Sequence, residues 1–266
     1  MYIFNKIKYL FTVLAIISFW HCSDYNKLLK GTNYDLKLEK ADNFYQKKSY
    51  VRAQQLYEEI IPIFKGTDKA EHIYYNFTWC NFYLGDFALS QFHFKNFVRQ
   101  FPSSEKSEEC YFMNGYCYYL NSPKYSLDQT ATINAIKEMQ SFIDNFPNSN
   151  LIDSANKIVA ILHKKLEKKE YEVLKQYRHM EDFKAVITSG ISYQKDYPDA
   201  EYIEEIRYWV IESYYLLGVN SIPVKKRERL EKVVEYYLKF VDLHPQSKFL
   251  PKAEDYYWKA KKEINS

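Results

Sequence analysis

The sequence predicts an all-α protein built from successive helix pairs, and two observations carry this prediction. A proline that would end a helix recurs at Pro102, Pro147, Pro198 and Pro245, at intervals of 45 to 51 residues. Proline cannot continue a helix, and it disfavours the helical conformation of the residue before it. Only six of the 266 residues are Gly, too few for a turn-rich β protein. Regular helix stops between amphipathic runs are typical of helical repeat arrays, which usually act as scaffolds for other chains.

Residues 71–102 carry the clearest repeat. Its diagnostic positions are, in chain order, Tyr74, Gly85, Asp86, Phe87, Ser90, Phe94 and Pro102. They give an early aromatic residue in a first helix, a Gly-Asp-aromatic turn, a small and then an aromatic residue in a second helix, and a terminal proline. Small residues allow the two helices to cross closely, and aromatic residues fill the layer between repeats. This is the pattern of the tetratricopeptide repeat.

Looser matches to this pattern continue along the chain. We therefore expect a tetratricopeptide-like right-handed superhelix of about five helix pairs, followed by a C-terminal capping helix that presents a polar outer face. The expected segments of this repeat domain, residues 35–266, are 35–65, 69–102, 104–147, 149–198 and 200–245, with the cap at 250–264. Two insertions are expected to separate the helices of a pair, at residues 121–130 and 218–226.

The first 21 residues are predicted to be a lipoprotein signal peptide. Lys6 and Lys8 precede about twelve mostly apolar residues, and Cys22 follows them. A helix that spans a bilayer needs about 20 apolar residues, so this stretch is typical of a signal-peptide core. We expect Cys22 to be the site of lipid attachment and residues 22–34 to form an N-terminal tether. The alternative is an ordinary secretory signal in which Cys22 is incidental.

The remaining cysteines, Cys80, Cys110 and Cys117, are odd in number and form no disulfide framework. We expect them to be buried as small hydrophobic residues, although a bridge from Cys80 to one of the other two stays open.

Charge and motifs exclude several classes of function. The net charge is +3, with 37 basic and 34 acidic residues interspersed, so no dominant basic face for nucleic acid is expected. The sequence contains no Gly-x-Ser-x-Gly, Walker loop or His-Glu-x-x-His motif. No two of its six His are three to five residues apart, which disfavours a metal site on a helix. We therefore expect no enzyme, cofactor or metal.

The first helix of each pair lines the inner surface of a tetratricopeptide array. In the register fixed by Gly85, Pro102 and Gly115, seven aromatic residues take these inward positions. The candidate peptide-binding groove is Tyr75, Trp79, Phe82, Tyr83, Phe112, Tyr116 and Tyr119. Aromatic side chains dominate peptide interfaces, so an extended segment with aromatic side chains is the expected ligand. The alternative is that these rings only pack on one another or on residues 25–34.

The insertion at residues 121–130 is a second candidate contact, because it interrupts a regular repeat and contains apolar residues. Its candidate partner-contact residues are Pro123, Tyr125, Leu127 and Asp128. The alternative is that Tyr125 and Leu127 pack against the repeat's own helices.

The order of these features resembles the BamD family, the tetratricopeptide lipoproteins of the outer-membrane β-barrel assembly (BAM) complex, in the form found in Bacteroidetes. The resemblance runs from Cys22 onward and includes residues 24–30, 50–59 and 97–102. Its most specific part is the Ser-Pro-Lys-Tyr-Ser-Leu-Asp-Gln stretch at residues 122–129.

The resemblance implies a lipid-anchored scaffold on the periplasmic face of the outer membrane. Its C-terminal repeats would bind the barrel subunit BamA, and its N-terminal half would receive unfolded outer-membrane proteins, whose ends carry aromatic segments. One alternative is another periplasmic tetratricopeptide scaffold lipoprotein of the cell envelope. A further alternative is a SusD-like nutrient-binding lipoprotein, although a chain of this length has no room for the large ligand-binding portion of such proteins.

Overall fold

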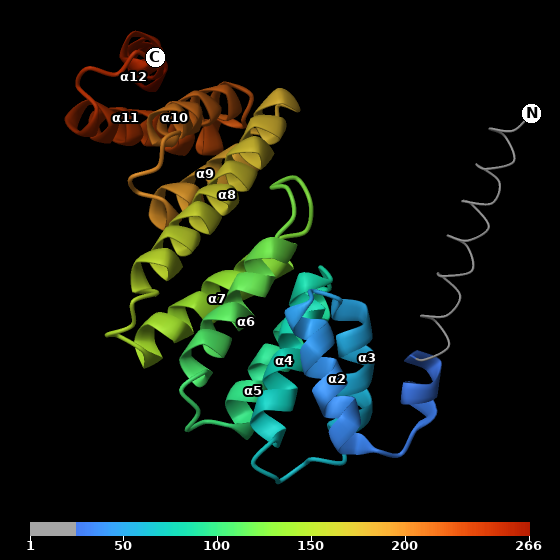
Figure 1. The fold of residues 1–266 in the computed structure, drawn as a ribbon. Coiled ribbons are helices and arrows are strands. Elements are labelled where there is room, and N and C mark those ends of the chain that lie inside the picture. The colour runs from blue at the N-terminus through green and yellow to red at the C-terminus, as the bar shows by residue number, and fades with distance from the viewer. Residues whose placement is uncertain (1–24) are drawn as a thin grey trace, which may run out of the picture. The chain divides into compact units, whose positions relative to one another are not determined.

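A computed structural model describes residues 25–266, and every regular element in that range is a helix (Figure 1). The helices are α2 (Tyr34–Gln46), α3 (Tyr50–Ile60), α4 (Ala70–Tyr83), α5 (Phe87–Gln100), α6 (Ser107–Asn121), α7 (Thr130–Asn145), α8 (Ile152–His179), α9 (Phe183–Asp196), α10 (Ile203–Val219), α11 (Pro223–Leu243) and α12 (Leu250–Asn265). Residues 25–30 form a further short helix. The predicted all-α, tetratricopeptide-like fold class is confirmed. The predicted signal peptide and Cys22 lie outside the described residues.

The four proline sequences form equivalent turns, which explains their recurrence. In each, the N–H of the second residue after the proline donates to the carbonyl of the residue before it, at 3.0 to 3.3 Å. In two of the turns, a serine also links the two helices of a pair by a hydrogen bond. Ser104 donates from Oγ to Glu71 at the start of α4 (2.7 Å), and Ser149 donates in the same way to Glu108 of α6. The end of the second helix is thereby fixed to the start of the first helix of the same pair.

The turns within three of the pairs share a different geometry. Lys48, Gly85 and Glu181 all adopt the left-handed conformation, with φ of 58°, 81° and 57°. The residue that follows each of them begins the next helix. In two cases it is an aspartate, Asp86 or Asp182, whose carboxylate accepts a hydrogen bond from the backbone N–H three residues on, at 3.0 and 3.1 Å. Only the middle turn has the glycine that this conformation favours.

The first helices of successive pairs contact each other in a register of 34 residues, which is the length of a tetratricopeptide repeat. This spacing separates the hydrogen-bonding partners Lys69 and Asp35, Tyr75 and Glu109, Tyr171 and Glu205, and Arg178 and Glu212. The contacts join α2 to α4, α4 to α6, and α8 to α10. The repeat period is thus visible directly as side-chain contacts.

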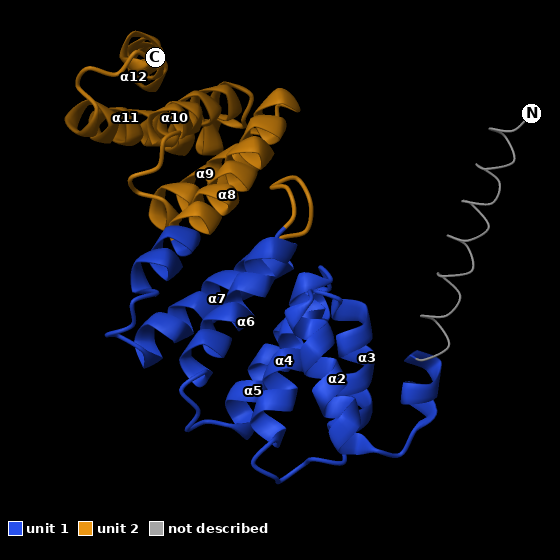
Figure 2. Cartoon of the chain, in the orientation of Figure 1, with its two compact units in different colours: residues 1–122, 130–159 blue, residues 123–129, 160–266 orange. Residues whose placement is uncertain are grey.

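The chain divides by its internal contacts into two compact units, although the sequence analysis treats residues 35–266 as one domain (Figure 2). The described part of the first unit is residues 25–122 and 130–159, and the second unit is residues 123–129 and 160–266. Helix α8 begins in the first unit and continues into the second.

Cys80, Cys110 and Cys117 are buried free thiols, so the bridge left open by the sequence is not formed among them. Burial raises the pKa of Cys80 and Cys117 to about 12.

A partly buried polar cluster holds three helices of the first unit in register. The Asp42 carboxylate of α2 accepts hydrogen bonds from the Tyr57 hydroxyl of α3 (2.6 Å) and pairs with His72 of α4 (2.8 Å). Asn76 donates to the same hydroxyl (3.1 Å). Burial alone would raise the pKa of Asp42, but the hydrogen bonds from His72 and Tyr57 outweigh it and lower the pKa. A group of this kind stabilises the fold above its unfolded-state pKa, and that stabilisation is lost as the pH falls through its folded-state pKa.

The second unit has a matching cluster around a buried carboxylate. Glu212 of α10 accepts hydrogen bonds from Arg178 of α8 (2.7 Å), Tyr208 (2.9 Å) and Tyr256 of α12 (3.2 Å). The hydrogen bond to Glu212 raises the pKa of Arg178. Because an unpaired buried carboxylate is costly, this cluster specifies how the three helices align.

One expected insertion is wrong. Residues 218–226 were predicted to separate the helices of the fifth pair, but α10 extends to Val219 and α11 begins at Pro223. Ile222 is extended (ψ 151°), and Pro223 occupies the first turn of α11, where its missing N–H has no helical partner to lose. The proline therefore starts a helix here instead of ending one.

The left-handed turns generate a stability prediction. We expect Lys48→Gly and Glu181→Gly each to raise the free energy of unfolding by about 0.5 to 1 kcal/mol, because glycine removes the left-handed penalty at some cost in chain entropy. Gly85→Ala should lower it by about 1 kcal/mol. Denaturant titration followed by circular dichroism measures all three. A loss of stability in both glycine variants would contradict the assigned turn geometry.

Candidate functional site

The 34-residue register brings two aromatic helix faces together within the first unit. The Tyr75 hydroxyl of α4 donates to Glu109 of α6 at 2.6 Å. Seven residues further along each helix, the rings of Phe82 and Tyr116 approach with centroids 6.4 Å apart. Side chains from two neighbouring repeats therefore meet on one surface.

The predicted groove residues form a continuous series of ring contacts. On α4, Trp79 contacts Tyr75 (6.1 Å between centroids), Phe82 (5.4 Å) and Tyr83 (5.4 Å). On α6, Tyr116 contacts Phe112 (6.0 Å) and Tyr119 (5.7 Å). The contact between Phe82 and Tyr116 links the two helices, so all seven predicted residues belong to a single aromatic network.

The seven rings differ in depth. Tyr83 is 48% exposed, whereas Phe112 is only 8% exposed and packs against Phe142 with centroids 5.5 Å apart. The other five are partly buried. Phe112 thus supports the surface from beneath, and the remaining six residues form its outer layer.

Two residues that the sequence analysis did not select extend this layer into the first helix pair. Tyr50 stacks on Tyr83 with centroids 4.5 Å apart, and Tyr45 lies 5.8 Å from Tyr50 and 6.5 Å from Tyr83. Tyr45 precedes Trp79 by one repeat length, a spacing that could have identified it. We call the eight residues of this layer the aromatic surface: Tyr45, Tyr50, Tyr75, Trp79, Phe82, Tyr83, Tyr116 and Tyr119.

The tyrosine hydroxyls of this surface are kept in their neutral, protonated form. Burial raises the pKa of Tyr45, and burial together with the nearby Glu109 raises that of Tyr75. Lys106 lies over the Tyr75 ring, with Nζ 4.4 Å from its centroid. The surface therefore offers ring faces and hydroxyl groups with one cation and one carboxylate at its edge.

The described N-terminal residues pack elsewhere in the first unit. The Tyr25 ring lies 5.6 Å from that of Phe44 on α2, and its hydroxyl donates to the backbone carbonyl of Arg52 (3.0 Å) and to Oε1 of Gln55 (2.8 Å) on α3. These contacts hold part of the predicted tether, residues 25–30, against α2 and α3.

The predicted partner-contact loop is shaped by one buried side chain. Gln129 donates from Nε2 to the carbonyls of Lys124 (2.9 Å) and Leu127 (3.0 Å). Lys169 of α8 donates to the same Leu127 carbonyl at 2.5 Å. Tyr125 and Leu127 nevertheless remain 37% and 57% exposed. The loop therefore holds a defined backbone while presenting these two side chains outward. Pro123 is partly buried and Asp128 is exposed.

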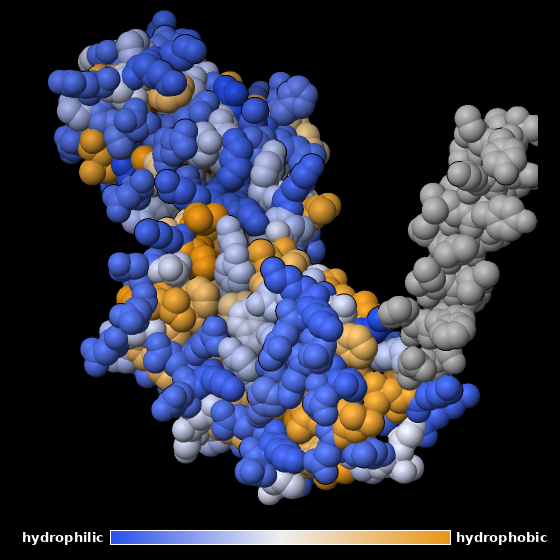
Figure 3. Space-filling model, viewed as in Figure 1, coloured by the Kyte–Doolittle hydropathy of each residue, from blue (hydrophilic) through white to orange (hydrophobic). Residues whose placement is uncertain are grey.

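The C-terminal helices carry a second exposed aromatic cluster. Tyr237 of α11 stacks on Tyr257 of α12 with centroids 4.5 Å apart, and Tyr257 contacts Trp258 at 5.0 Å. Trp258 is 60% exposed and Leu238 is 51% exposed. On the face in Figure 3, however, hydrophobic residues gather mainly over the first unit.

Within residues 25–266, no group of three or more His, Cys, Asp or Glu side chains is placed to hold a metal ion. The same residues include no helix that is long and apolar enough to cross a membrane.

The helix pairs define a tetratricopeptide-like repeat protein that presents a partly exposed aromatic surface. Residues 35–230 match the family model YfiO, described as outer membrane lipoprotein, and the chain belongs to this family. The resemblance to BamD is confirmed by two relatives named outer membrane protein assembly factor BamD. The protein from Pasteurella multocida (strain Pm70) is 21% identical over 196 residues, covering 70% of this chain and 75% of its own.

The second relative, from Haemophilus influenzae (strain ATCC 51907 / DSM 11121 / KW20 / Rd), is 21% identical over 228 residues, covering 82% of this chain and 87% of its own. Among solved structures, the TPR2AB-domain:pHSP90 complex of yeast Sti1 covers 87% of this chain and 99% of that chain, with 13% identity and a TM-score of 0.39. The assignment to the Bacteroidetes form of the BamD family stays a prediction.

The difference in depth between the rings predicts different costs of truncation. Phe112→Ala should lower the free energy of unfolding by about 3 to 5 kcal/mol, because it leaves a cavity against Phe142. Tyr83→Ala should cost about 1 kcal/mol or less, because nearly half of its side chain is already in solvent. Thermal or denaturant unfolding of the two variants gives the comparison, and equal costs would contradict the layered arrangement.

Proposed function

We propose that this protein is a lipid-anchored scaffold on the periplasmic face of the outer membrane that assists the assembly of β-barrel proteins. The family match over residues 35–230 carries this proposal, and the names of the two relatives support it. In this function the chain holds two kinds of partner, an unfolded barrel protein and the BamA-type barrel subunit that receives it.

The aromatic surface is the proposed site for the unfolded partner. Its rings come from α4 and α6 and are extended by Tyr45 and Tyr50, so an extended segment can cross two repeats. Aromatic side chains bury a large area at low entropic cost, and they dominate peptide interfaces. Tyrosine hydroxyls add hydrogen-bonding groups for a bound backbone. The ligand that fits this chemistry is an extended segment with aromatic side chains, as at the ends of β-barrel proteins.

A peptide-binding measurement tests this site. Trp79→Ala combined with Tyr116→Ala should weaken binding of a barrel-derived peptide with an aromatic C-terminus by at least about 30-fold, which corresponds to about 2 kcal/mol at an interface hot spot. Phe92→Ala combined with Trp258→Ala is the matched control, because it removes two exposed aromatic rings outside the surface. Equal affinity in all three proteins, each still folded, would contradict the proposal.

The C-terminal repeats are the proposed site for the BamA-type subunit. Trp258 and Leu238 are exposed beside the stacked pair Tyr237 and Tyr257, and exposed aromatic clusters are typical of protein interfaces. The loop with Tyr125 and Leu127 belongs to the same compact unit and is the proposed second contact.

Affinity purification from native membranes tests the second partner. The wild-type protein should retain a large β-barrel protein with periplasmic repeats, and Trp258→Ala combined with Leu238→Ala should reduce its recovery several-fold. Replacing residues 122–129 by a short turn should have a smaller effect in the same direction while helical content is unchanged. Phe92→Ala combined with Ile133→Ala, two exposed residues of the first unit, should have no effect. Recovery of a different envelope complex would favour another periplasmic scaffold function.

Cys22 is the proposed site of lipid attachment. A single acyl chain anchors a protein only marginally, so multiple acylation is expected. Mass spectrometry of protein extracted from membranes should find an N-terminal, acylated Cys22, and Cys22→Ala should release the protein from the membrane fraction. An unmodified N-terminus at another residue, or unchanged fractionation of the variant, would contradict the anchor.

A further inference from the structure

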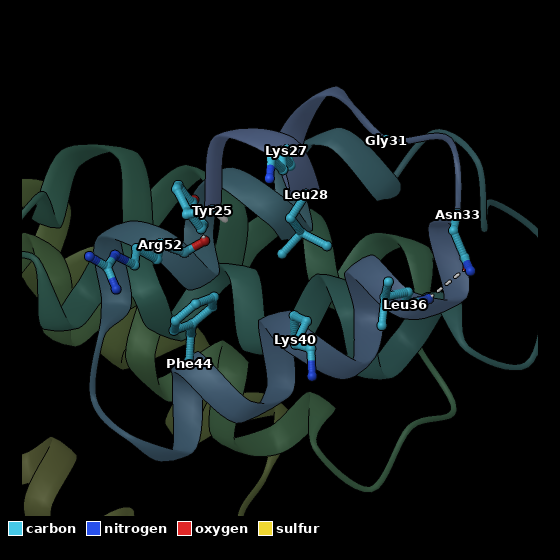
Figure 4. A pocket seen from close by; sticks show the side chains of 9 residues that line it. All are labelled: Tyr25, Lys27, Leu28, Gly31, Asn33, Leu36, Lys40, Phe44 and Arg52. Atoms are coloured by element: carbon cyan, nitrogen blue, oxygen red, sulfur yellow. Dashed lines mark hydrogen bonds between the residues drawn. The ribbon is translucent and has the colours of Figure 1, made fainter. Parts of the chain in front are cut away.

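A hollow in the first unit lies between the short helix at residues 25–30 and helices α2 and α3 (Figure 4). Its volume is about 490 Å3. The side chains that line it are Tyr25, Lys27, Leu28, Gly31, Asn33, Leu36, Lys40, Phe44 and Arg52. We call this the N-terminal pocket. It shares no residue with the aromatic surface.

The lining combines an apolar floor with positive charge. Leu28, Leu36 and Phe44 supply apolar surface, while Lys27, Lys40 and Arg52 supply positive charge. Figure 4 shows Arg52 beside Tyr25 and Phe44, and Lys40 between Phe44 and Leu36. Of the described residues that line the pocket, none is acidic.

Two of these cations, Arg52 and Lys40, are held differently. The Arg52 guanidinium carbon lies 5.4 Å from the centroid of the Tyr25 ring and 5.6 Å from that of Phe44, so the aromatic rings position it. Lys40 pairs with Glu39 at 3.1 Å, and both of these side chains are well exposed. An exposed ion pair of this kind is weak because water competes with it, so Lys40 can leave Glu39 and pair with another anion.

The place of the pocket in the chain limits its distance from the proposed anchor. Tyr25 follows Cys22 by three residues, which span at most about 11 Å even when fully extended. If Cys22 carries the lipid, the pocket is confined near the membrane surface, where headgroup phosphates and the first methylene groups are available. Clusters of Lys and Arg near a membrane attract anionic lipids.

We propose that the N-terminal pocket binds an anionic phospholipid of the membrane to which the protein is anchored. The negatively charged headgroup lies against the cations of the lining, and the glycerol and upper acyl chain lie on Leu28, Leu36 and Phe44. This inference rests on the proposed lipid anchor for its argument from distance. The bound lipid would orient the first repeats at the membrane, in addition to the covalent attachment.

Photocross-linking in intact cells tests the proposal with the full-length protein. The photoreactive residue p-benzoylphenylalanine replaces Leu36 in the pocket or, as a control, Leu89 on α5. The two side chains are matched in exposure, at 39% and 38%. Mass spectrometry of the irradiated protein should find phospholipid adducts, enriched in phosphatidylglycerol or cardiolipin, at position 36 and at least tenfold fewer at position 89.

Charge reversal supplies the second arm. Lys40→Glu combined with Arg52→Glu should reduce the lipid adducts at position 36 at least tenfold. The control is Lys47→Glu combined with Lys157→Glu, which changes two exposed residues outside the pocket and should leave the adducts unchanged. Circular dichroism confirms that each variant is folded.

Three outcomes would overturn the proposal. The first is cross-linking of position 36 to another protein, and the second is cross-linking only within the chain, including to its own acyl chains. The third is that charge reversal leaves the number of lipid adducts unchanged. The mass of the wild-type protein shows separately whether Cys22 is acylated. An acylated protein without lipid adducts at position 36 would refute the pocket and leave the anchor intact. An unacylated protein with charge-dependent adducts would refute the anchor and leave the pocket intact.

Discussion

The structure depends on the packing of the first helices of neighbouring pairs at an offset of one repeat length. In the first unit this offset pairs Tyr75 with Glu109 and Phe82 with Tyr116, which converts separate aromatic positions on α4 and α6 into one surface. A shift of one residue between the helices would turn the rings of one helix by about 100° relative to those of the other, since an α-helix has 3.6 residues per turn. The aromatic surface therefore exists only while this register is kept.

Polar groups that are wholly or partly buried make that register costly to change. Asp42 with Tyr57 and His72 in the first unit, and Glu212 with Arg178 in the second, each join three helices through a carboxylate that is satisfied only in the observed alignment. Apolar packing tolerates sliding better than hydrogen bonding does, because an unsatisfied buried carboxylate keeps its full desolvation cost. The clusters thus supply specificity, and the packing of apolar and aromatic side chains supplies buried area.

The sequence predicts the helix pairs well because their ends carry strong local signals, such as the four proline turns and the glycine at position 85. It does not predict that Lys48 and Glu181 adopt the same left-handed geometry, because the surrounding helices impose it against their own preference. The expected insertion at residues 218–226 is wrong because Pro223 lies in the first turn of α11, where a proline is tolerated. For the site, the register of Gly85 selects helix faces whose rings contact one another in the structure. The depth of Phe112 and the addition of Tyr50 depend on packing against α7 and α3, which no single segment of sequence reveals.

The central claim is that the aromatic surface receives extended segments of unfolded barrel proteins. It is tested most directly by nuclear magnetic resonance of protein with isotope-labelled tyrosine and tryptophan rings, to which an unfolded barrel segment is added. We expect the ring signals of Trp79, Tyr83, Tyr116 and Tyr119 to shift together with a single affinity, while those of Trp258 and Tyr257 do not move. Shifts confined to the second unit, or to Tyr25 in the N-terminal pocket, would contradict it.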